Sequence, residues 1–221
     1  MIKVIYEDNH LLVVEKPVNI LSQGDNTSDD DMVNLLKKYL KEKYNKPGNV
    51  FVGLVHRLDR PVGGILVFAK TSKAASRLSE QVRNKTFKKT YRAVIHGTMN
   101  KESDTLKDYL YKNKKTNMVS VVNKNHKDAK DAKFSYITLA SKDGFSIVEI
   151  DLKTGRPHQI RVQFSSRNHT LYGDQRYGKD VNKKGQQIAL WSYKIEIEHP
   201  TKKEKMEFIC EPPNKYPWNM F

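Results

Sequence analysis

The chain has 221 residues, enough for one large domain or two small ones, and a formal charge of +15 from 40 Lys and Arg against 25 Asp and Glu. This charge indicates a polyanionic partner, and nucleic acid fits it better than a membrane surface; a soluble basic protein without such a partner is the alternative. No apolar run approaches the roughly 20 residues of a membrane-spanning helix, and the first residues lack a signal-peptide pattern. One cysteine in the chain rules out an internal disulfide and favours the reducing cytoplasm.

The start of the chain predicts a hairpin followed by a helix. Residues 1–8 alternate like a strand, and the apolar run 11–17 predicts a second strand that a proline ends. Three aspartates at 29–31 precede apolar residues at helical spacing over 32–43, with lysines toward the end, as helix dipoles favour. The aspartates are typical of a helix start, and a metal site is the less favoured alternative.

The stretch 56–71 carries the leading catalytic candidate. It places one carboxylate, Asp59, between Arg57 and Arg60 on a short loop that contains proline and glycine. Nearby cations favour the ionised form of an acid. The apolar run 65–69, which follows a double glycine, predicts a fully buried strand that would hold this loop rigidly.

The next elements indicate a compact α/β or α+β unit. Ser72 is the predicted N-cap of a helix that runs to about Asn84. A strand is predicted over 90–97, where residues that favour strands, including Tyr91, end at a glycine. Strand, helix and strand therefore follow one another with short connections.

Residues 99–133 are rich in Lys, Asn and Asp and predict an excursion with two short strands and mobile basic loops. The lysines are candidates for phosphate contacts, and a solvated surface is the alternative. A hairpin is predicted next, from strands at 134–140 and 145–152 that a Gly-containing turn joins.

A short helix and two strands complete the chain. Pro157 suits the first turn of a helix in which His158 and Arg161 share one face. Strands are predicted over 188–199 and 205–210, where apolar and polar residues alternate. Strands outnumber helices, which favours an α+β fold with mixed or antiparallel pairing over a doubly wound sheet.

Several kinds of site are disfavoured by the residues. The seven histidines are scattered, so a zinc site is not expected, and neither a phosphate-binding glycine loop nor a serine elbow is present. Carboxylate chemistry remains, since an aspartate held ionised beside a cation can act as a nucleophile. We expect the sheet to bring Asp59 and Arg161 together; for each residue alone, an ordinary ion pair is the alternative.

Taken together, these motifs resemble those of the RluA family of RNA pseudouridine synthases, in the expected order and over most of the chain. They are 6–8, 11–17, 56–59 with 63–64 and 69–71, Tyr91, 154–156 with 158–161, and 173–178. The resemblance implies a single catalytic domain over 1–221 with an α+β pseudouridine synthase fold: a mixed, mostly antiparallel central sheet, flanking helices and a central catalytic cleft. It also implies isomerisation of uridine in structured RNA, ribosomal or transfer, by a cytoplasmic monomer without cofactor or metal.

The resemblance also implies roles for single residues. Asp59 would be the catalytic nucleophile or base at the ribose, Tyr91 would stack on the base and assist proton handling, and Arg161 would hold Asp59 ionised. Arg57 would fill the space of the flipped base, and His56 would support the loop. The other RNA-binding candidates are Arg60, Lys89, Arg156 and His158, with support of the catalytic residues as the alternative for the last two.

Three features depart from the family pattern. Asn19 stands where a glycine is usual, and the loop 60–64 differs from the common Thr-Ser-Gly pattern. The basic N-terminal RNA-binding module of many relatives is not expected, because the motifs begin almost at the first residue. Target recognition is therefore expected from the lysine-rich segments 101–133 and 179–184.

Two other functions compete with RNA isomerisation. A non-catalytic RNA-binding or RNA-folding protein on the same scaffold would not need Asp59, Tyr91 and Arg161 together. Glycosidase-like cleavage of a nucleoside would ordinarily need two cooperating carboxylates, and the motifs supply one.

Overall fold

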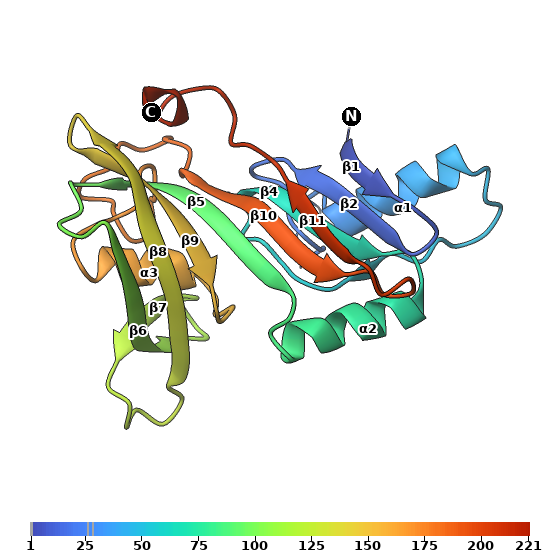
Figure 1. Ribbon diagram of the computed structural model, residues 1–221, viewed down its shortest axis with the longest axis horizontal. Coiled ribbons are helices and arrows are strands. Elements are labelled where there is room, and N and C mark those ends of the chain that lie inside the picture. Colours follow the sequence, from blue (N-terminus) through green and yellow to red (C-terminus); the bar gives the residue numbers. More distant parts are fainter. Residues whose placement is uncertain (1, 26, 28) are drawn as a thin grey trace. The chain divides into compact units, whose positions relative to one another are not determined.

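The computed structural model describes residues 2–25, 27 and 29–221, in which eleven strands, three α-helices and one short 3-10 helix are found (Figure 1). The chain forms two compact units: unit 1 comprises Met1–Lys88 with Ser192–Glu211, and unit 2 comprises Lys89–Trp191 with Pro212–Phe221. Whether they act as the single domain expected from the sequence stays a prediction. Among the described residues, no helix is long and apolar enough to cross a membrane.

Unit 1 is built on a mostly antiparallel sheet. It contains β1 (Lys3–Glu7), β2 (Leu11–Lys16), α1 (Met32–Lys43), β3 (Gly53–Leu54), β4 (Gly63–Ala69), α2 (Ser72–Arg83), most of β10 (Leu190–Glu198) and β11 (Lys205–Ile209). The strands lie in the order β1-β2-β4-β10, with β3 also on β4 and β11 on β10. The first strand was expected from Met1, which lies outside the described residues.

Strand β4 confirms the prediction of a fully buried strand and extends it. All seven of its residues are buried, and it begins at Gly63 rather than at Ile65. Gly64 has a φ of +110° and approaches the neighbouring backbone so closely that an added Cβ would lie 2.3 Å from the Ser192 carbonyl oxygen. Only glycine tolerates both the positive φ and the close approach at this position of the strand.

The two helices of unit 1 lie where the sequence predicted them. Helix α1 begins after Asp31, whose side chain accepts a hydrogen bond from the Asn34 N–H, as expected for an acid at a helix start. The N-cap of α2 is Thr71, which accepts from the Ala74 N–H, and not Ser72 as predicted. Both are hydroxyl residues, and the extended backbone of Thr71 places its oxygen over the first turn.

Unit 2 contains a second run of antiparallel strands. Its elements are most of β5 (Lys88–His96), β6 (Ser103–Lys112), β7 (Val119–Val122), β8 (Lys130–Lys142), β9 (Phe145–Leu152), α3 (Gln159–Ser165) and the 3-10 helix (Trp218–Met220). The strands lie in the order β5-β9-β8-β6-β7. The hairpin of β8 and β9 confirms the prediction, and every strand pairing whose register the structure gives is antiparallel.

The lysine-rich excursion is more regular than predicted. Strand β6 has ten residues, and Ser103–Leu110 pairs without interruption with Lys130–Ile137 of β8. The prediction of two strands is confirmed, but the prediction of short strands was wrong for β6. Its lysines and aspartates are interspersed with a few buried residues, such as Leu106 and Leu110. The sequence therefore looks like a polar loop, although it forms a half-buried strand.

Helix α3 packs on the sheet of unit 2 through Phe164, whose ring centroid lies 5.2 Å from that of Phe134 and 5.5 Å from that of Tyr136. The predicted start of this helix needs correction. His158 is the N-cap residue, in a left-handed conformation with a φ of +51°, and Pro157 precedes it. His158 therefore stands before the helix and not on one of its faces.

Candidate active site and RNA-binding residues

Asp59 lies on the loop that joins β3 to β4 in unit 1, and the residue before it is fixed through both of its backbone polar groups. The Leu58 N–H donates to Ser22 Oγ over 3.0 Å, and Ser22 Oγ donates in turn to the Leu58 carbonyl over 2.8 Å. Both residues are buried. Because a buried polar group that loses its partner is costly, these two bonds hold the backbone on the N-terminal side of Asp59 in one position.

Lys16 holds the C-terminal side of Asp59. Its side chain is completely buried, and Nζ donates to the carbonyl oxygens of Pro17, Ile20 and Arg60 over 2.9, 2.6 and 3.1 Å. An ammonium group has three N–H donors, so the three carbonyls use all of them. Burial lowers the pKa of Lys16 to about 7, although the Asp59 carboxylate acts to raise it.

The two arginines beside Asp59 have different surroundings. Arg60 donates from Nε to the Asn19 carbonyl over 3.2 Å, and its guanidinium binds Asp29 Oδ2 over 2.7 Å. Arg57 is exposed and makes no hydrogen bond or ion pair with any residue that the structure describes. Of these two RNA-binding candidates, Arg57 is therefore the one available to an external partner.

Tyr91 lies on β5 in unit 2, opposite Ile150 of β9. It is buried, with an exposed fraction of 6%. Lys89 stands two positions earlier on the same strand, and because alternate residues of a strand face the same side, Lys89 and Tyr91 share one face of the sheet.

Arg161, on α3, forms a buried two-point ion pair with Asp174. Its Nε donates to Asp174 Oδ2 over 2.8 Å and Nη2 donates to Oδ1 over 2.7 Å. Burial acts to raise the pKa of Asp174, but the Arg161 guanidinium and the N–H groups of Arg176 and Tyr177 outweigh it and lower that pKa. Asp174 therefore fixes the guanidinium in one orientation.

Tyr177 gives Arg161 a second support. The guanidinium carbon lies 5.3 Å from the centroid of the Tyr177 ring, within the range of a cation–π contact. The Tyr177 hydroxyl oxygen accepts the Val119 N–H over 3.0 Å and lies 2.7 Å from His158 Nδ1. Tyr177 thus links Arg161, the start of β7 and His158, the N-cap residue of α3.

The turn before α3 is also fixed by side chains. Gln159 is buried, and its Oε1 accepts from Thr154 Oγ1 over 2.8 Å and from the Arg156 N–H over 3.0 Å. Arg156 in turn binds Asp131 through its guanidinium over 2.6 Å. The RNA-binding candidate Arg156 is therefore paired with a carboxylate of the chain itself.

The structure groups the predicted site residues by unit. Asp59 lies in unit 1, and Tyr91 and Arg161 lie in unit 2. The contact of Asp59 with Arg161 stays a prediction. Three supporting residues were not assigned a role from the sequence: Lys16, Asp174 and Tyr177. Each stood inside a recognised motif, but its partners lie on other segments, and no local pattern identifies such contacts.

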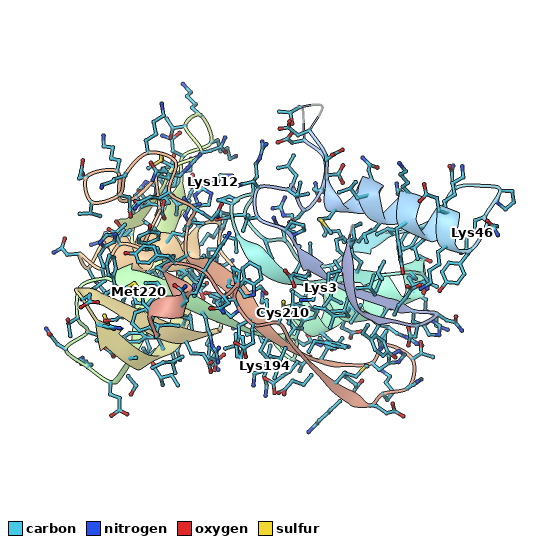
Figure 2. All side chains as sticks on the ribbon, turned by 90° about the horizontal axis from the view of Figure 1, so that it is seen from above. Lys3, Lys46, Lys112, Lys194, Cys210 and Met220 are labelled. Carbon is cyan, nitrogen blue, oxygen red and sulfur yellow. The ribbon has the colours of Figure 1, made fainter. Side chains whose placement is uncertain are left out.

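Exposed lysines occur in both units. Lys46 follows α1 in unit 1, and Lys112 ends β6 in unit 2 (Figure 2). Within the excursion, Lys101 is paired with Asp104 over 2.8 Å. The lysines of the excursion that lie at or beyond the end of β6 and are exposed are Lys112, Lys114, Lys115, Lys124, Lys127, Lys130 and Lys133.

Comparisons with solved structures agree with this architecture. The structure of human RNA pseudouridylate synthase domain containing 4 superposes with a TM-score of 0.79 at 19% identity, over 96% of this chain and 88% of that one. Human RNA pseudouridylate synthase domain containing 1 gives a TM-score of 0.75 at 23% identity, over 98% and 85%. The predicted α+β pseudouridine synthase fold is therefore confirmed.

Sequence comparisons give relatives in bacteria. Ribosomal large subunit pseudouridine synthase D of Borreliella burgdorferi is 33% identical over 97% of this chain and 66% of its own length. Ribosomal large subunit pseudouridine synthase C of Buchnera aphidicola is 32% identical over 92% of this chain and 65% of its own length. The chain thus spans just under two thirds of the length of these relatives.

A family model described as RNA pseudouridylate synthase matches residues 10–166. This range contains the Asp59 loop, Tyr91 and Arg161, and it covers well over half of the chain. By this match and by its fold, the chain belongs to the RNA pseudouridylate synthase family.

Proposed function

We propose that this chain converts uridine in structured RNA to pseudouridine, with Asp59 as the catalytic nucleophile or base. The family match over 10–166 carries the proposal, together with the presence of Asp59, Tyr91 and Arg161 within it. Relatives named for the ribosomal large subunit favour ribosomal RNA as the substrate, with transfer RNA as the other candidate. A cytoplasmic location and action as a monomer, without cofactor or metal, belong to the same proposal.

The reaction is an isomerisation whose atoms balance without a co-reactant. The bond between the ribose C1′ and the uracil N1 breaks, the base rotates, and a bond forms between C1′ and C5. The proton on C5 leaves, and N1 gains one. Asp59 acts at the ribose either by bonding to C1′ or by removing a proton, and the bonds on both sides of it, at Leu58 and Arg60, support a fixed geometry.

Arg161 and Tyr91 complete the proposed catalytic set. A guanidinium has five N–H donors and can bind two carboxylates at once, so Arg161 held by Asp174 is suited to hold Asp59 ionised as well. Tyr91 would stack on the target base and assist the proton transfers at C5 and N1. The burial of its ring suits a contact with an extruded base.

Base extrusion leaves a gap in the RNA that a protein side chain can fill. The structure favours Arg57 for this role, because it is exposed and has no partner among the described residues. We propose that Arg60, Arg156 and His158 act mainly by supporting the site, since each contacts another residue of the chain. Lys89 remains as an RNA contact.

The substitution Asp59→Asn tests the function. With in vitro transcripts of ribosomal and transfer RNA, which contain no pseudouridine, we expect the wild-type protein to form pseudouridine at defined sites. Asp59→Asn should form none while binding the RNA with near wild-type affinity. Asp143→Asn, at an exposed aspartate in the turn between β8 and β9, is the matched control and should keep full activity.

Three outcomes would contradict the proposal. Equal activity of Asp59→Asn would remove the catalytic assignment. RNA binding by the wild-type protein without any pseudouridine in RNA that relatives do modify would favour a binding protein on the same scaffold. Release of free uracil would indicate cleavage instead of isomerisation.

A further inference from the structure

Lys89 is a half-buried lysine without a counter-charge in the part of the chain that the structure describes. Its side chain makes no hydrogen bond and no ion pair with any of these residues. Burial lowers the pKa of its ammonium group. A cation that is withdrawn from water without a partner raises the free energy of the folded chain, and such groups are enriched at functional sites.

The neighbouring lysine shows the contrast. Lys88 is exposed, and its Nζ lies 3.9 Å from Glu196 Oε1. Successive residues of a strand point to opposite faces, so these two lysines face different surroundings although they are adjacent in sequence. The lack of a partner is therefore a property of the face that Lys89 shares with Tyr91.

Lys89 also lies against the turn that leads into α3. A Cβ added at Gly155 would lie 3.3 Å from Lys89 Nζ, so the ammonium group reaches the backbone of this turn. The Gly155 N–H makes no hydrogen bond with any described residue, and Gly155 is exposed. Thr154 and Arg156, on either side, are held by Gln159.

The unpaired ammonium group of Lys89 thus lies against a turn that is held in place, and the Gly155 N–H in this turn has no partner among the described residues. Phosphate oxygens accept hydrogen bonds from ammonium and backbone N–H groups together, as they do wherever glycine lets a backbone approach an anion. Lys89 and Tyr91 lie two positions apart on β5, so their backbones are separated by about 6.5–7 Å. The base and the phosphate of one nucleotide are separated by a distance of the same order.

We propose that Lys89 and the Gly155 N–H form a binding site for a backbone phosphate of the RNA, at the nucleotide whose base stacks on Tyr91. The identity of the ligand as RNA rests on the proposed function. The new element is a contact that would fix the backbone phosphate relative to the reacting base. A side chain at Gly155 would displace the ammonium group by a few tenths of an ångström from its place against the turn.

The salt dependence of RNA binding tests this site. The probe is a fluorescein-labelled RNA stem-loop with uridines in its loop, and affinity is measured by anisotropy at several salt concentrations. Each phosphate contact that is lost lowers the slope of log affinity against log salt by about 0.7–0.9. We expect Lys89→Met to show this decrease in slope and an affinity loss of about tenfold at low salt.

Matched variants separate this contact from the general charge of the protein. Lys88→Met removes the same charge one residue away and should leave the slope nearer to the wild-type value, because its amine faces Glu196. Lys89→Arg should restore most of the affinity. Gly155→Ala should weaken binding while Lys89 is retained.

Thermal unfolding excludes a purely structural role. Because Lys89 is half-buried and unpaired, Lys89→Met should unfold at the same temperature as the wild type or higher. A wild-type salt slope for Lys89→Met, or a decrease equal to that of Lys88→Met, would overturn the proposal. A marked fall in its unfolding temperature would do the same, because it would assign the lysine to the fold.

The binding measurement needs no catalysis, so the two proposals fail separately. Absence of pseudouridine formation by the wild-type protein would remove the proposed function and leave the salt slope of Lys89→Met to report on the phosphate site. An inactive Asp59→Asn together with an unchanged slope for Lys89→Met would remove the phosphate site alone.

Discussion

At the scale of single residues, the site depends on buried charges that the chain itself neutralises or solvates. Lys16 is surrounded by three carbonyl oxygens, and Arg161 is bound by Asp174 at two points. Asp59 and Arg161 could be selected from the sequence because they stand in recognisable motifs. The partners that orient them could not, because Arg161 meets Asp174 only after α3 and the following loop have folded together.

Asp174→Asn tests the importance of this pair. The substitution breaks the buried two-point ion pair of Asp174 with Arg161, and the loss of one partner of such a pair typically costs about 3–5 kcal/mol. We expect the free energy of unfolding in denaturant to fall by that amount and isomerisation to fall with it. Asp143→Asn, at an exposed aspartate in the turn between β8 and β9, should change neither. Unchanged stability of Asp174→Asn would show that the pair does not fix Arg161.

At the scale of elements, Glu7 joins β1 to α1 and to the residue after β4. Its carboxylate accepts from Tyr39, Lys43, Tyr44 and Lys70 over 2.6–2.9 Å. Burial acts to raise the pKa of Glu7, but these four donors outweigh it and lower the pKa to about 2.

The stability of this junction should depend on pH. The pKa of Glu7 is lower in the folded chain than the ordinary value of 4.5, so its contribution is fully present above pH 4.5 and is lost as the pH falls toward 2. Glu7→Gln should lower the free energy of unfolding by about 1–3 kcal/mol at pH 7, and its difference from wild type should shrink toward pH 2. Denaturant unfolding between these pH values measures this, with Glu42→Gln, at an exposed glutamate of α1, as the control. A difference between Glu7→Gln and wild type that stays constant with pH would contradict it.

Elements were predicted well where one local signal dominates. The apolar run of β4, the acid before α1 and the Gly-containing turn between β8 and β9 each determine structure over a few residues. Strand β6 was underestimated because its charged residues alternate with only a few apolar ones, and its length comes from pairing with β8. The left-handed His158 was missed because the contact of its ring with Tyr177 is made across a loop.

At the scale of the whole molecule, the charge of +15 and the proposed catalytic residues of both units support the same proposed function. Unit 1 carries Asp59 on a fixed loop with Arg57 exposed beside it, and unit 2 carries Tyr91, Arg161 and the proposed phosphate contact at Lys89. Such a charge attracts polyanions without regard to sequence, which suits the proposed RNA substrate. We therefore assign RNA binding to many lysines and the reaction at the ribose to Asp59, assisted by Tyr91 and Arg161.

Mapping of pseudouridine in cells tests that assignment most directly. The ribosomal and transfer RNA of cells that lack this protein should have lost pseudouridine at one or a few positions. Expression of the wild-type chain should restore these positions, and expression of Asp59→Asn at the same level should not. Restoration by Asp59→Asn, or an unchanged map in cells that lack the protein, would contradict the account.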